Sequence, residues 1–153
     1  MSKRIWIYLS DKKITNELHA SISNDCVNFI LEWNAHGTKL DSGFKILHEH
    51  FLIFEVNDEN HHASGCSIDK QVQFIKQLEQ KFSINLLNRL LVAYRLNNDV
   101  VVKTANEVKQ AVKNNLLSPD TITFDISITD SELFKTEFEK PISLSWLMPK
   151  TMA

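Results

Sequence analysis

The apolar residues of this chain change their spacing along its length, and the order of these changes constrains the fold more than any other feature. Segments rich in β-branched and aromatic residues predict strands, and segments whose apolar residues recur every three or four positions predict helices. Strand-like segments follow one another directly at two places, which favours antiparallel pairs joined by turns. The expected strands are 4–9, 44–47, 51–56, 90–96, 100–102 and 121–129.

Three segments carry a helical spacing. The first spans 14–33, and its apolar stripe consists of Ile14, Leu18, Ile22, Cys26, Phe29 and Trp33. The second follows a polar loop at 57–65, and its stripe consists of Ile68, Val72, Ile75, Leu78 and Phe82. The third begins at a capping-box pattern formed by Thr104 and Glu107. A weaker, short helix is expected at 131–138.

This order predicts one α+β domain over residues 1–153. Its strands should form a mainly antiparallel sheet of about five or six strands, with the three main helices packed on one face. Segment 51–56 is apolar on both faces and is therefore expected at the centre of the sheet. Segment 121–129 alternates between apolar and polar residues, so one of its faces should be wet.

Composition and charge limit the class of protein. Hydrophobic residues make up 43% and charged residues 24%, which is typical of a soluble globular protein. Seventeen Lys and Arg against nineteen Asp and Glu give no basic field, which disfavours nucleic-acid binding. No apolar run approaches the roughly 20 residues that cross a bilayer, so membrane insertion is not expected.

The start of the chain and its two cysteines predict a cytoplasmic location. The first apolar run ends at Ser10 after five residues, which is too short for a secretory signal. Cys26 and Cys66 would remain reduced in the cytoplasm. The alternative is a disulfide between them.

The most unusual segment is ASGCSIDK, which joins the polar loop to the second helix. Ser67 is the expected N-cap, which places Cys66 beside free backbone N–H groups at the positive end of a helix. That position favours a reactive thiolate or a bound anion, with Lys70 adding charge and Gly65 allowing close approach. The alternative is that Ser67 and Asp69 cap the helix while Cys66 fills a small gap.

Two further residues are candidates for the same site. His36 follows the first helix in the string Trp33-Asn-Ala-His36-Gly37 and could act as a general base for Cys66. Alternatively, His36 caps the carbonyl groups at that helix end. Arg89 opens a strand and could bind a carboxylate or phosphate with two hydrogen bonds, or pair with a surface acid instead.

Four histidines form a separate group: His48, His50, His61 and His62. Together with Asp58, Glu59 and Cys66 they could hold a transition metal. The chain contains neither a C-x-x-C nor an H-E-x-x-H pattern, so a wet loop is favoured for the His61-His62 pair. No metal or other cofactor is expected.

The strings IWIY at 5–8, W-x-x-H-G-x-x-L at 33–40, FLI at 51–53 and SGCSIDK at 64–70 occur together and are followed by Arg89. In these strings the chain resembles a family of short bacterial proteins that often carry the label "ABC transporter ATPase", over roughly the first two-thirds of its length. The motif positions are Trp33, His36, Gly37, Gly65, Cys66, Ser67, Asp69, Lys70 and Arg89.

The label implies ATP hydrolysis, and the sequence contradicts it. A phosphate-binding P-loop needs two glycines five positions apart followed by Lys and Ser or Thr. Gly37, Gly43 and Gly65 do not have this spacing, and no Leu-Ser-Gly-Gly string occurs. The resemblance supplies no catalytic residues.

Two functions are favoured at this point, ahead of a third, a metal-binding protein that uses the loop histidines. The first is a module that binds a small anionic ligand or an acidic group of a protein partner, in a pocket formed by 33–37, 65–70 and Arg89. The second is an enzyme of acyl or thiol transfer in which Cys66 is the nucleophile and His36 is its base.

Overall fold

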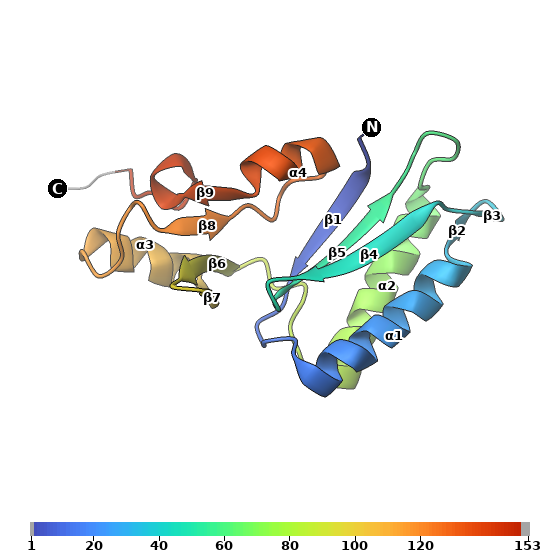
Figure 1. The fold of residues 1–153 in the computed structure, drawn as a ribbon, viewed down its shortest axis with the longest axis horizontal. Helices are drawn as coiled ribbons and strands as arrows, with labels where there is room; N and C mark the ends of the chain where they lie inside the picture. Colours follow the sequence, from blue (N-terminus) through green and yellow to red (C-terminus); the bar gives the residue numbers. More distant parts are fainter. Residues whose placement is uncertain (1, 151–153) are drawn as a thin grey trace.

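The computed structural model describes residues 2–150, which form an α+β fold with antiparallel sheets of three, two and four strands (Figure 1). The elements in chain order are β1 (Arg4–Leu9), α1 (Asn16–Glu32), β2 (Asn34–Ala35), β3 (Thr38–Lys39), β4 (Ser42–Leu47), β5 (Phe51–Val56), α2 (Gly65–Phe82), β6 (Leu91–Leu96), β7 (Asp99–Thr104), α3 (Ala105–Lys113), β8 (Ile122–Phe124), α4 (Ser131–Glu137), β9 (Glu139–Pro141) and a 3-10 turn, η1 (Ile142–Leu144). No helix in this part of the chain is long and apolar enough to span a membrane.

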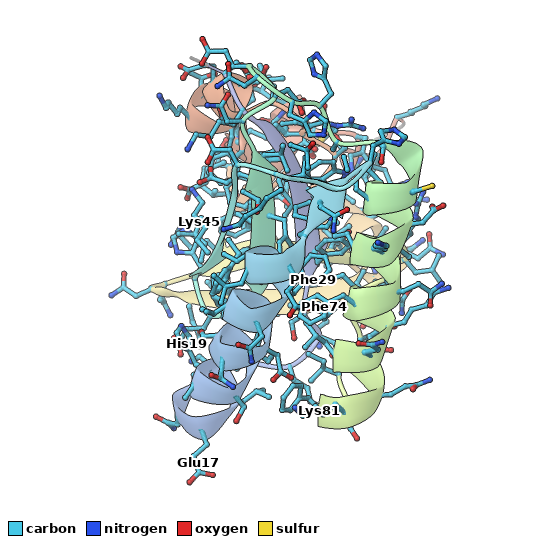
Figure 2. The ribbon with its side chains drawn as sticks, turned by 90° about the vertical axis from the view of Figure 1, so that its right-hand side faces the viewer. Glu17, His19, Phe29, Lys45, Phe74 and Lys81 are labelled. Carbon is cyan, nitrogen blue, oxygen red and sulfur yellow. The ribbon has the colours of Figure 1, made fainter. Side chains whose placement is uncertain are left out.

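The three-stranded sheet has the order β1-β5-β4, so the strand predicted to be central is central. Helices α1 and α2 cover one of its faces (Figure 1). Between the two helices, the rings of Phe29 and Phe74 stack with their centroids 4.4 Å apart (Figure 2). Both rings also contact Phe54 of β5, which joins the helices to the sheet.

The opposite face of this sheet packs against the second half of the chain. Phe51 and Ile53 of β5 point to that side. The ring of Phe51 lies 4.9 Å from that of Phe124 and 5.1 Å from that of Phe138, measured between centroids. Strand β5 therefore contributes to two hydrophobic clusters, one on each face.

The four-stranded sheet has the order β7-β6-β8-β9. Val108 and Val112 of α3 are buried against it, in a cluster that includes Val92 of β6. The two larger sheets meet near β1, where Ile5 and Leu9 pack in one cluster with Phe124 of β8. Arg4 also forms an isolated antiparallel bridge with Asp130, in the segment that precedes α4.

The prediction of one sheet of five or six strands, with three helices on one face, is wrong in these details. The strands divide between separate sheets, and α3 covers a different sheet from α1 and α2. The physical reason is that the two predicted hairpins pair with different further strands. The β4–β5 hairpin pairs with β1, and the β6–β7 hairpin pairs with β8, which in turn pairs with β9. Helix α2 carries the chain from one sheet to the other.

Local predictions are confirmed in part. The strand at 4–9, the strand at 51–56 and the Thr104–Glu107 capping box are present. Strand β8 ends at Phe124 because the carboxylate of Asp125 accepts a hydrogen bond from the Ser127 N–H (3.0 Å) and turns the chain. Residues 125–129 therefore do not continue the predicted strand.

Candidate functional site

The start of α2 is formed by a reciprocal serine cap. The Ser64 hydroxyl accepts a hydrogen bond from the Ser67 N–H (3.1 Å), and the Ser67 hydroxyl accepts one from the Ser64 N–H (2.7 Å). Ser64 is therefore the N-cap and the helix begins at Gly65, which corrects the prediction of Ser67. Ser67 is buried as the third helical residue, where its hydroxyl and its backbone N–H both take part in the cap.

Cys66 lies in the exposed first turn of α2 as a free thiol. It does not fill a gap in the core, which was the alternative, whereas Cys26 is fully buried as predicted. The backbone N–H groups of Gly65 and Cys66 have no hydrogen-bond partner between residues 2 and 150. Asp69 and Lys70 are exposed on the following turn.

The structure brings the W-x-x-H-G segment beside this helix start. The indole N–H of Trp33, which is 2% exposed, donates to the carbonyl oxygen of Ser67 (2.8 Å). The Nε2 atom of His61 lies 2.7 Å from the carbonyl oxygen of Ala35. These two contacts tie the ribbon β2–β3 to the loop and first turn of α2.

The turn of this ribbon is formed by His36 and Gly37, which both have positive φ angles, 52° and 81°. Paired positive φ angles are typical of a tight hairpin turn. His36 is exposed at its tip, and α1 ends before it, at Glu32, with Trp33 as the C-cap. The helix-capping alternative for His36 is therefore not what the structure shows.

Arg89 lies elsewhere. It follows the end of α2, and the 18 residues of that helix separate its two ends by about 27 Å. Arg89 lines a cavity of about 790 Å³ whose walls come from β1, the 86–92 segment, β8 with the turn after it, Lys140 of β9 and the 144–147 segment. No residue of 33–40 or 64–70 lines this cavity, so the predicted grouping of Arg89 with the start of α2 is not formed there.

The lining of this cavity is mostly apolar and carries three charged side chains. Lys140 pairs with Asp125 (3.3 Å) and with Glu137 (3.6 Å). Burial alone raises the pKa of Asp125, but hydrogen bonds from Ser127 and the pairing with Lys140 outweigh it and hold the pKa below its ordinary value. Asp125 is therefore ionised near neutral pH and neutralises Lys140. Within the described residues Arg89 has no ion pair and no hydrogen bond, so it supplies one unmatched positive charge.

The backbone that carries Arg89 is fixed at several points. The Glu79 carboxylate accepts hydrogen bonds from the N–H groups of Leu86 (2.8 Å) and Leu87 (3.1 Å). The Asp11 carboxylate accepts from the backbone N–H (2.7 Å) and side-chain amide (2.8 Å) of Asn85. These bonds anchor the connection to α2 and to the end of β1, so Arg89 projects from an ordered base.

The histidines do not assemble into a metal site. His50 is buried, with Nδ1 2.8 Å from the carbonyl oxygen of Ser10, and His48 packs its ring near Phe124. Both lie at the β4–β5 turn, where the backbone is not straight, so they do not share a strand face. Across residues 2–150, no three His, Cys, Asp or Glu side chains lie close enough to hold a metal ion.

Comparisons with known proteins assign no role to these residues, so the site is interpreted from its geometry alone. No family model, curated protein or solved structure matches the chain. Sequence reasoning missed the cavity because its walls come from five segments that are distant along the chain, and only Arg89 marked it in advance.

Proposed function

We propose that the protein is a binding module and that its ligand site is the cavity lined by Arg89. The observation that carries the proposal is an unmatched guanidinium on a largely apolar cavity of about 790 Å³. Ligand pockets of roughly 300–1,000 Å³ combine apolar walls with a few polar groups that fix orientation. The ligand should therefore have an apolar body and one anionic group, which Arg89 can bind with two hydrogen bonds.

Replacing Arg89 with glutamine is expected to weaken the binding of such a ligand about tenfold, because a hydrogen bond to a charged group contributes about 1.5–3 kcal/mol and this one is partly solvated. The probe is 8-anilinonaphthalene-1-sulfonate, which carries one sulfonate on an aromatic body and reports binding by fluorescence. Octanoate serves as the competitor.

The matched control is Lys76→Gln, which removes the same charge from an exposed position of α2 that does not line the cavity. It should bind the probe as the unmodified chain does. The proposal is wrong if the probe shows no saturable binding below millimolar concentration, or if Arg89→Gln and Lys76→Gln bind it equally well.

A second candidate function, a thiol-dependent enzyme of acyl or thiol transfer, is favoured by the exposure of Cys66 beside the W-x-x-H-G segment. In this case Cys66 is the nucleophile, His36 is its base, and the unpaired N–H groups of the first turn bind the developing anion.

The second candidate is tested by the rate at which iodoacetamide labels Cys66 at pH 7, compared with N-acetylcysteine. A thiol activated by a base should react at least tenfold faster than the free compound, and His36→Gln should remove the difference. Buried Cys26 serves as the internal control and should stay unlabelled. A rate equal to that of N-acetylcysteine excludes this candidate.

The remaining expectations from the sequence stay proposals. A cytoplasmic location is supported by two free cysteines, of which one is exposed. The absence of a basic field supports a partner other than nucleic acid. Membership of the family labelled "ABC transporter ATPase" is supported by the quoted motifs, and ATP hydrolysis is not part of the proposal.

A further inference from the structure

The outer edge of β1 is open over part of its length. Its inner edge pairs with β5 along the whole strand. Peptide groups of an antiparallel strand point alternately to its two edges, and the Ile5 N–H points outward because it donates to the carbonyl oxygen of Thr129 (2.9 Å). By this alternation the N–H and C=O groups of Ile7 and Leu9 also point outward.

Contacts with other segments bound the open stretch at both ends. At one end, the Thr129 carbonyl oxygen accepts the Ile5 N–H, and Arg4 forms its bridge with Asp130. At the other end, the Asp11 N–H donates to the carbonyl oxygen of Asn85 (3.2 Å). Between these contacts lies a window from Ile5 to Leu9, about 13 Å long at the rise of an extended strand.

The outward-pointing N–H groups of Ile7 and Leu9 have no hydrogen-bond partner in the described part of the chain. Ile7 and Leu9 both line the cavity, and Leu9 is only 3% exposed. Backbone N–H and C=O groups are nearly always paired with protein or water, so unpaired ones that border a cavity are free to bind an occupant that supplies donors and acceptors. An added strand supplies both at the spacing that the window requires.

The rest of the cavity is suited to the end of a peptide chain. Leu144 and Trp146 line it while remaining 75% and 64% exposed, so they offer apolar surface to alternate side chains of a strand. Arg89 offers an unmatched charge to a carboxylate. Contacts bound the window at both ends. A strand that terminates inside it has to pass only one of these contacts, whereas a strand that runs through has to pass both.

We propose that this cavity binds the C-terminal segment of a partner protein, about four residues long, as an added strand on β1, with the terminal carboxylate on Arg89. The inference rests on the proposed function for the location of the ligand. It adds the class of ligand and the hydrogen bonds that bind it.

The test uses the full chain labelled with ¹⁵N and a pool of acetylated hexapeptides with free C-terminal carboxylates. The last four positions of the pool vary among valine, leucine, isoleucine, phenylalanine, serine and threonine. Bound peptides should slow hydrogen exchange of the Ile7 and Leu9 amides at least tenfold. The amides of Trp6 and Tyr8, which already pair with β5, should change little and serve as the internal control.

Two further arms test the carboxylate. The same pool amidated at its C-terminus should bind at least tenfold more weakly, and Arg89→Gln should lose this difference while Lys76→Gln keeps it. A third pool, amidated and carrying one internal glutamate, should also bind weakly. Equal binding of the free-acid pool and either amidated pool overturns the assignment to a chain terminus.

The remaining outcomes separate this inference from the proposed function. If the anilinonaphthalene probe binds with the expected dependence on Arg89 but no hexapeptide binds below about 1 mM, the cavity takes a small molecule and the peptide inference is wrong. Peptide binding that leaves exchange at Ile7 and Leu9 unchanged also overturns it. If neither probe nor peptide binds, both proposals are wrong.

Discussion

Replacing Phe54 with alanine is expected to lower the free energy of unfolding by about 4 kcal/mol, since truncating a buried phenylalanine costs about 3–5 kcal/mol. Phe54 is fully buried at the centre of the three-stranded sheet. Its ring contacts rings from β1, β4, α1, α2 and the residue after α1: Tyr8, Phe44, Phe29, Phe74 and Trp33. The loss is a large part of the 5–15 kcal/mol typical of a domain.

The measurement is urea unfolding followed by circular dichroism, with Phe54→Leu as the matched control. Leucine keeps much of the volume and should cost less than half as much. A cost below about 1.5 kcal/mol for Phe54→Ala would show that the surrounding rings close over the space, and that this ring is not central to the core.

Raising the pH from 9 to 12 is expected to destabilise the fold by several kcal/mol, because two buried groups resist ionisation. Burial, with a smaller effect of the negative charge on Asp25, raises the pKa of Cys26 from 9.0 to about 12. Burial likewise raises the pKa of Tyr8 from 10.0 to about 12. The unfolded chain therefore loses these protons first. The stabilisation is complete below pH 9 and is lost as the pH rises through 12, at about 1.4 kcal/mol per pH unit and group.

Urea unfolding at pH 8, 9, 10 and 11 tests this expectation. Between pH 9 and 10 the slope should come mainly from Cys26, so Cys26→Ala should flatten it there and leave the decline above pH 10 that Tyr8 causes. Cys66→Ala, at the exposed cysteine, should keep the slope of the unmodified chain. The explanation fails if Cys26→Ala retains the full slope between pH 9 and 10.

Local patterns predicted the elements well, because the signals lie within a few residues of the positions that they determine. The apolar strand at 51–56 and the Thr104–Glu107 capping box are of this kind. The division into separate sheets could not be predicted in this way. It depends on which strands find partners beyond their own hairpin, and the β6–β8 pair joins segments separated by a helix.

The candidate site shows the same limit. The SGCSIDK string correctly indicated a helix start, but Ser64 and Ser67 are both suitable caps, and only their reciprocal bonding decides between them. The contact of Trp33 with the Ser67 carbonyl brings the two motifs together as expected. The position of Arg89 was missed, because it depends on the length of α2 and on the bonds from Asp11 to Asn85.

Strand β5 presents Phe54 to the helices and Phe51 to the second half of the chain, so neither half has a complete interior without it. A fragment that stops after α2 would expose one side of this strand to water, and a fragment that starts at β6 would lack the surface on which it folds. We therefore expect that neither half folds as an independent unit. The two halves should melt together, in one transition.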